Sequence, residues 1–131
     1  MYAIRIGDVA GYTAPPPYAR ELKVLLSPTL HDLRNVAVGV MTLPAGGSGG
    51  THKHHETEEI WYIISGCGQV RVGEEVRTVE PGMVIMGPPG IPHGFVNNGS
   101  EPLQALWIIS PAGDEQPILD GLATQRKAQG A

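Results

Sequence analysis

Short apolar runs, each closed by glycine or proline, follow one another along most of this chain. Residues 60–64 form a compact run too short for a helix, and residues 69–72 alternate between polar and apolar side chains, as a strand with one buried face does. The same reading, with turn residues between the runs, predicts further strands at 2–6, 36–43, 76–79, 83–86, 93–96 and 103–109. About eight short strands without a long helix indicate an all-β jelly-roll barrel.

The two ends of the chain follow a different pattern. Residues 7–17 finish in three prolines and predict a stiff, extended arm. Residues 18–26 fit either a strand or one helical turn, and residues 119–127 fit a short helix. We therefore expect a single domain over residues 1–131, with an N-terminal arm at 1–35, a barrel core at about 36–110 and a C-terminal tail at 111–131.

Composition and charge exclude several classes of protein. The formal net charge is −4, which argues against a nucleic-acid partner because such proteins carry basic patches. No apolar run has the length of a membrane span, and the first residues do not resemble a signal peptide, so a cytoplasmic location is expected. The single cysteine, Cys67, lies between two glycines with no activating base nearby, which favours a structural role over a nucleophilic one.

Two separated segments carry the candidate chemistry. His52 and His54 are two residues apart, so on a strand they point to the same side, and Glu59 follows after a short bend. His93 belongs to a different predicted strand. Imidazole and carboxylate groups together suit a transition-metal ion. From these residues alone the alternative stays open that the histidines are exposed strand residues and that residues 56–59 form a solvated acidic turn.

These two segments resemble the two sequence motifs of the cupin family. The first motif has glycine, five residues, His-x-His, four residues, glutamate, six residues and glycine. The second has glycine, five residues, Pro-x-Gly, two residues, histidine, three residues and asparagine. The matching positions in this chain are Gly46, His52, His54, Glu59 and Gly66 for the first motif, and Gly82, Pro88, Gly90, His93 and Asn97 for the second.

The resemblance implies a conical cupin β-barrel with a metal ion inside. Its ligands would be His52, His54, Glu59 and His93, holding one divalent transition metal such as Fe, Mn, Ni, Zn or Cu. Strand alternation turns two neighbours, His55 and Glu58, away from the ligands. The resemblance also gives Asn97 a bracing role, whereas His31 lies outside both motifs and is expected to be structural.

The residues that share the ligands' side predict the wall of a substrate pocket. This wall is apolar and aromatic, and it is expected to consist of Trp61, Ile63 and Phe95, with Met86 and Trp107 as further candidates. Such a wall fits a small and rather apolar molecule, oriented by the metal. The lack of a lysine or arginine cluster on this face weakens the case for a sugar phosphate.

Three functions remain open at this point. The preferred one is an oxygenase or dioxygenase that acts on a small apolar or aromatic substrate. The alternatives are a non-redox isomerase, cyclase or lyase that uses the metal as a Lewis acid, and a non-catalytic binding or sensing module. Small cupins are usually dimers, so a homodimer is expected, with the N-terminal arm covering a sheet edge of the partner.

Overall fold

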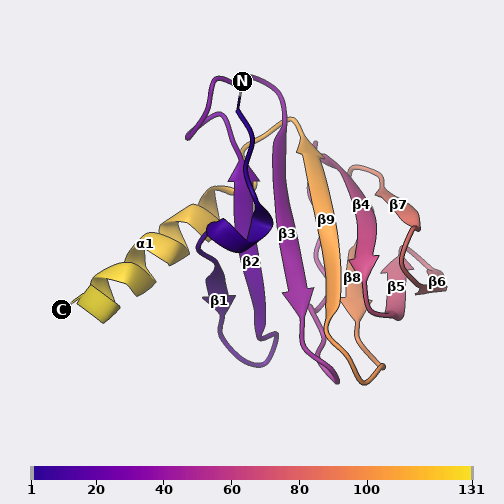
Figure 1. Cartoon of the computed structure of the whole chain (residues 1–131). Helices are drawn as coiled ribbons and strands as arrows, with labels where there is room; N and C mark the ends of the chain where they lie inside the picture. Colours follow the sequence, from indigo (N-terminus) through magenta and orange to yellow (C-terminus); the bar gives the residue numbers. More distant parts are fainter. Residues whose placement is uncertain (1, 131) are drawn as a thin grey trace.

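Two antiparallel sheets face each other in the computed structural model, which describes residues 2–130, and a helix extends from one side (Figure 1). The larger sheet has the strand order β1-β2-β3-β9-β4-β7, and the smaller has the order β6-β5-β8. The strands are β1 (Tyr12–Ala14), β2 (Arg20–Leu26), β3 (Ala37–Leu43), β4 (Glu58–Ser65), β5 (Gly68–Val72), β6 (Glu75–Val79), β7 (Val84–Gly87), β8 (His93–Val96) and β9 (Leu103–Ser110). A 3₁₀ turn, η1 (Ile6–Asp8), precedes them and α1 (Gln116–Gly130) follows. The predicted jelly-roll class is confirmed.

The N-terminal part of the chain differs from its sequence-based prediction. The strand predicted at residues 2–6 is wrong: this segment pairs with no neighbouring strand, and Tyr2 and Ile4 are 58% and 41% exposed. The extended arm instead contains β1, which is only three residues long, and residues 20–26 of the ambiguous segment 18–26 form β2. Both strands belong to the larger sheet, so the predicted arm contributes to the sandwich itself.

Alternation along the strands builds the core and prepares the site. On β4, Trp61 and Ile63 are 3% and 0% exposed, whereas their neighbours Ile60 and Tyr62 are 40% and 45% exposed. The same inward face carries Glu59, which is 8% exposed and therefore lies among apolar side chains. A carboxylate in this position is costly to bury unless it is paired or binds a cation.

The loop between β8 and β9 is braced by a buried side chain. Asn97 is 0% exposed. Its amide nitrogen donates to the carbonyls of Leu43 (3.0 Å) and Glu101 (2.8 Å), and its amide oxygen accepts from the backbone N–H of Gly99 (3.0 Å). These bonds join the end of β3 to the β8–β9 turn, which is the bracing role expected of this residue.

Helix α1 lies against the edge of the larger sheet. The side-chain amide of Gln125 donates to the carbonyl of Thr13 (2.7 Å) and accepts from its backbone N–H (3.1 Å), so it pairs with strand β1 as a strand residue would. Gly121 packs against the ring of Tyr12, where an added Cβ would lie 2.6 Å from a ring carbon. Within residues 2–130, no helix has the length and apolar character required to cross a membrane.

Candidate metal centre

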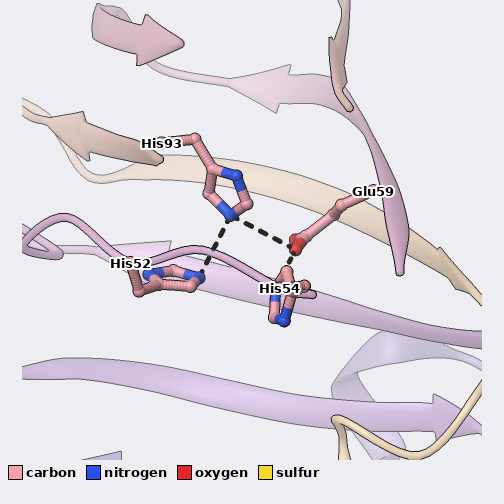
Figure 2. A group of neighbouring side chains, drawn as sticks. All are labelled: His52, His54, Glu59 and His93. Carbon is pink, nitrogen blue, oxygen red and sulfur yellow. Dashed lines mark hydrogen bonds and ion pairs between the residues drawn. The ribbon is translucent and has the colours of Figure 1, made fainter. Parts of the chain in front are cut away.

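Four side chains point their ligand atoms at one place between the two sheets (Figure 2). The candidate ligand atoms of His52, His54, Glu59 and His93 all lie within 4.8 Å of one another. Nε2 of His54 is 3.0 Å from Oε1 of Glu59, Nε2 of His93 is 3.6 Å from the same oxygen, and Nε2 of His93 is 3.2 Å from Nε2 of His52. These are the four residues that the cupin resemblance pointed to.

Backbone pairing across the sandwich brings the two motifs together. His52 and His93 form an isolated antiparallel bridge, in which each backbone N–H donates to the carbonyl of the other at 3.0 and 2.8 Å. His54 is fixed two residues later, where its carbonyl accepts from the N–H of Gly90 at 2.7 Å. The close approach requires glycine at position 94, because a Cβ there would lie 2.0 Å from the carbonyl oxygen of Gly50.

The three imidazoles have different proton affinities. Burial, together with the neighbouring histidines, lowers the pKa of His93 to about 4. Burial also lowers the pKa of His52, whereas the hydrogen bond to Glu59 raises the pKa of His54. Near neutral pH, His93 and His52 are therefore neutral with a free lone pair, which is the form that binds a metal.

The donor set fits one transition-metal ion. Ligand atoms about 2.1 Å from a common ion are separated by about 3.0 Å at right angles and about 3.4 Å in a tetrahedron. The observed separations of 3.0 and 3.2 Å lie within this range, and that of 3.6 Å lies slightly above it. Two imidazole nitrogens at 3.2 Å need either a shared proton or a cation between them. The arrangement is thus consistent with a single metal ion bound by three imidazoles and a carboxylate.

The cupin-domain family model matches residues 39–109, which include both motifs and more than half of the chain. The chain belongs to the cupin family. The uncharacterized protein MJ1618 of Methanocaldococcus jannaschii is 33% identical over 90 residues, 69% of this chain and 72% of the relative. A predicted oxalate decarboxylase from Thermotoga maritima has a TM-score of 0.77 and 25% identity, covering 85% of this chain and 100% of that structure. The polyketide cyclase RemF of Streptomyces resistomycificus has a TM-score of 0.75 and 23% identity, covering 86% and 80%, and shares the fold.

A cavity of about 510 Å³ opens onto the metal centre of this cupin. Trp61 and Phe95, which strand alternation places on the ligands' side, line it, and so does the further candidate Trp107. Ile63 does not line it: this residue lies deeper along β4 and is fully buried in the core. Met86 does not line it either, because it pairs with the outward-facing Ile60 and is 64% exposed on the outer face of the sheet.

Several cavity residues were not predicted as site residues from the sequence. Arg20, Tyr12 and Tyr18 come from the N-terminal part of the chain, and Asp114 comes from the segment before α1. Reading residues 20–26 as a strand would have placed Arg20 on the same side as Leu22, which also lines the cavity. No local signal marks Asp114, because its position depends on the path of the chain after β9.

Arg20 is the one lysine or arginine among the described residues that line this cavity. Its Nη1 donates to the carbonyl of Tyr18 at 2.8 Å, and it forms no ion pair with an acidic residue in the described part of the chain. Burial lowers the pKa of the guanidinium from its usual value. The guanidinium stays charged nonetheless and keeps donors free for an anion.

The remaining candidates lie away from the ligand cluster. His55 and Glu58 are exposed and do not belong to it, as alternation predicted. Nδ1 of His31 accepts from the N–H of Ser27 at 3.2 Å in a separate loop. Cys67 is exposed and free.

Proposed function

We propose that this cupin is a metal-dependent enzyme acting on a small molecule with an apolar or aromatic body and an anionic oxygen group. The observation that carries the proposal is the cavity in which the cluster of three histidines and Glu59 shares its walls with aromatic rings and with Arg20. Apolar pockets with a few convergent polar groups are the usual form of small-molecule sites. A site built for binding alone does not require four metal ligands.

The favoured reaction class is non-redox: an isomerisation, cyclisation or lyase step. A bound divalent metal would act as a Lewis acid on a substrate oxygen. Such a reaction also needs groups that hold or move a proton, and Tyr12 and Tyr18, which line the cavity, are the candidates for this role. Arg20 would bind the anionic end of the substrate, while Trp61 and Phe95 would exclude water from its body. Two proteins of similar fold, a polyketide cyclase and a predicted oxalate decarboxylase, are compatible with this class.

An oxygenase, the function preferred from the sequence, is the second candidate. The Trp61 ring lies beside His93, with ring centroids 4.7 Å apart, and the Phe95 ring lies 5.4 Å from that of Trp61. This dry, aromatic side suits an apolar substrate that reacts with dioxygen and needs little acid–base help. Four ligands would leave two positions open on a six-coordinate ion.

Metal analysis followed by anaerobic and aerobic assays separates these functions. Protein purified without chelators should contain close to one equivalent of a transition metal. Protein reloaded with Zn²⁺, Mn²⁺, Ni²⁺ or Fe²⁺ would then be tested with acetylacetone, catechol and oxaloacetate, with oxygen uptake and products followed in parallel. Turnover without oxygen supports the non-redox class, and iron-dependent oxygen uptake supports the oxygenase. Absence of stoichiometric metal after reloading would rule out both.

A further inference from the structure

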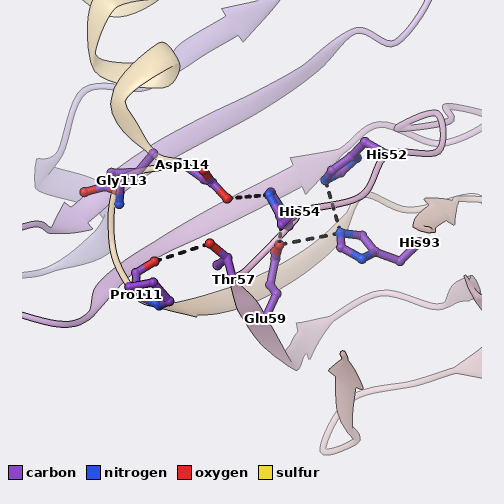
Figure 3. A network of polar contacts seen from close by, with 9 residues as sticks. His52, His54, Thr57, Glu59, His93, Pro111, Gly113 and Asp114 are labelled. Atoms are coloured by element: carbon purple, nitrogen blue, oxygen red, sulfur yellow. Dashed lines mark hydrogen bonds and ion pairs between the residues drawn. The ribbon is translucent and has the colours of Figure 1, made fainter. Parts of the chain in front are cut away.

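The imidazole of His54 is held from both sides (Figure 3). Its Nε2 faces Glu59 in the ligand cluster, and its Nδ1 lies 2.6 Å from Oδ2 of Asp114. A carboxylate on the outer nitrogen of a metal-binding histidine keeps the proton there, orients the ring and makes the inner nitrogen a better ligand. His93 is different, because its Nδ1 has no hydrogen-bond partner in the part of the chain that the structure describes.

Asp114 is not held in place by its own surroundings. Its side chain is 43% exposed, and its ion pair with His54 is the only one it makes among residues 2–130. It follows Gly113 in the connection between β9 and α1. A half-exposed carboxylate in such a connection loses side-chain entropy when it is ordered, so a neighbouring group has to fix its backbone.

The next residue provides this anchor. Glu115 is 2% exposed, and its Oε2 accepts from the hydroxyl of Ser27 at 2.6 Å while its Oε1 accepts from the backbone N–H of Gly113 at 2.5 Å. Ser27 is 0% exposed and directly follows β2. The bond to Ser27 thus attaches the segment that carries Asp114 to the end of a sheet strand, and the bond to Gly113 fixes the backbone just before Asp114.

A buried carboxylate such as that of Glu115 is an unusual way to fasten a helix to a sheet if packing is its only purpose. No lysine or arginine pairs with Glu115 among the described residues. Burying a carboxylate without a cation is expensive, and an apolar side chain of similar size would fasten a helix at lower cost. Short charge-assisted hydrogen bonds instead fix the position and direction of the backbone.

We propose that Glu115 and Ser27 are positioning residues that hold Asp114 against His54 and thereby set the metal affinity of the site. This inference rests on the metal centre of the proposed function and adds to it a part of the chain outside both cupin motifs. The same segment supplies Pro117 and Ile118 to the cavity wall, so the anchor also fixes one side of the substrate space.

A simpler role for Glu115 makes a different prediction. Its carbonyl accepts from the N–H groups of Ile118 (3.0 Å) and Leu119 (3.4 Å), so it also begins α1. If Glu115 only anchored the helix, its replacement would lower stability without changing metal affinity. If replacing Glu115 lowers metal affinity in the wild type but not in a variant that already lacks the Asp114 carboxylate, then Glu115 acts on the metal site through Asp114.

The test is a double-mutant cycle on the full chain, with Zn²⁺ affinity measured by competition against a chromophoric chelator. Asp114→Asn should weaken Zn²⁺ binding by about 10–100-fold, the typical effect of losing such a partner. Glu115→Ala and Ser27→Ala should weaken it in the same direction by a smaller factor, and Glu115→Gln should recover part of the loss. The matched control is Asp120→Asn, which changes an exposed carboxylate of α1 whose one hydrogen-bond partner among the described residues is Gln116, and it should bind as the wild type does.

In the Asp114→Asn background, Glu115→Ala should change Zn²⁺ affinity by less than twofold. The proposal is overturned if Asp114→Asn binds Zn²⁺ with wild-type affinity. It is also overturned if Glu115→Ala lowers Zn²⁺ affinity as much in the Asp114→Asn variant as it does in the wild type. Circular dichroism checks folding; if Glu115→Ala does not fold, Ser27→Ala and Glu115→Gln complete the same cycle. A wild type that binds no Zn²⁺ rejects the metal centre itself, which distinguishes failure of the proposed function from failure of the anchor alone.

Discussion

His52 and His93, 41 residues apart in the sequence, exchange both backbone hydrogen bonds and bring their Nε2 atoms to 3.2 Å from each other. This pair joins the two motifs, so removal of one ring should remove the site. We expect His93→Ala to weaken metal binding by well over the ~10–100-fold seen when only a supporting partner is lost. His55→Ala is the control, because His55 is exposed beside the same motif. Full metal content in His93→Ala, measured by elemental analysis, would contradict the ligand assignment.

Arg20 predicts a preference for anionic ligands. A hydrogen bond to a charged group contributes about 1.5–3 kcal/mol, so Arg20→Gln should weaken binding of an anion by about 10–100-fold. Calorimetry of the Zn²⁺-loaded protein with benzoate and with benzamide measures this difference, and benzamide binding should hardly change. Arg77→Gln is the control, since Arg77 pairs with Glu75 on the surface. Equal losses for both probes would show that Arg20 does not select for charge.

The metal-free protein should lose stability as the pH falls from 6.5 toward 4. His93 has a folded-state pKa of about 4 against 6.5 in the unfolded chain, so in this window only the unfolded chain binds the proton. His54 acts in the opposite sense: its raised pKa contributes stability that is fully present below 6.5 and is lost as the pH rises through the folded value. Urea unfolding in the presence of a chelator should show that the free energy of unfolding falls less steeply with decreasing pH in His93→Gln than in the wild type. The same pH dependence in variant and wild type would rule out His93 as the source.

Position 87 tests how closely the aromatic wall is fitted to the site. A Cβ at Gly87 would lie 2.7 Å from the ring of Trp61 and 3.2 Å from Nδ1 of His93. Gly87→Ala should therefore displace both rings, cost about 1–3 kcal/mol of unfolding free energy and weaken Zn²⁺ binding. Gly90→Ala is an informative comparison, because its Cβ would meet nothing within 4 Å although its φ of +75° adds backbone strain. If Gly87→Ala binds Zn²⁺ with unchanged affinity, the Trp61 ring accommodates the added methyl group without displacing His93.

The homodimer expected from the sequence remains a prediction, and one face of the larger sheet fits it. On β4 and β7 the cross-strand pairs Ile60–Met86 and Tyr62–Val84 point outward, are uncharged and are 40–66% exposed. These four side chains form an uncharged apolar patch that is complementary to itself across a two-fold axis, so we expect a second copy there. Light scattering should give a dimer for the wild type and a monomer for Val84→Glu. The control Val76→Glu lies on the smaller sheet, where Val76 is 45% exposed. A monomeric wild type at high concentration would make the prediction wrong.

Most strands and the four candidate ligands could be predicted from the sequence because they depend on local features. Alternation and turn residues define β3 to β9, and the spacing of the two motifs singles out His52, His54, Glu59 and His93. Alternation also puts Trp61 and Phe95 on the ligands' side, and both line the cavity. It could not separate Trp61 from Ile63, because both share a face of β4 and differ only in their depth along the strand.

The other half of the cavity could not be predicted in this way. Arg20 lies on a segment whose sequence fits either a strand or a helical turn, and Tyr12 belongs to a strand too short to give an alternating pattern. Asp114 and Glu115 follow the last strand, in a polar segment with no periodicity. Their roles depend on contacts with His54 and Ser27, which are 60 or more residues away in sequence and become visible only in the folded chain.

Gln125 offers to β1 the donor and the acceptor that a tenth strand would offer. An edge strand with unpaired peptide groups can pair with strands of other chains and so cause aggregation. Many proteins prevent this pairing with charged residues or proline on the edge strand. Here the side-chain amide of Gln125 on α1 occupies the outward peptide groups of the edge strand β1. A chain shortened before α1 would leave that edge strand uncovered, and its first defect would be aggregation rather than loss of the sandwich.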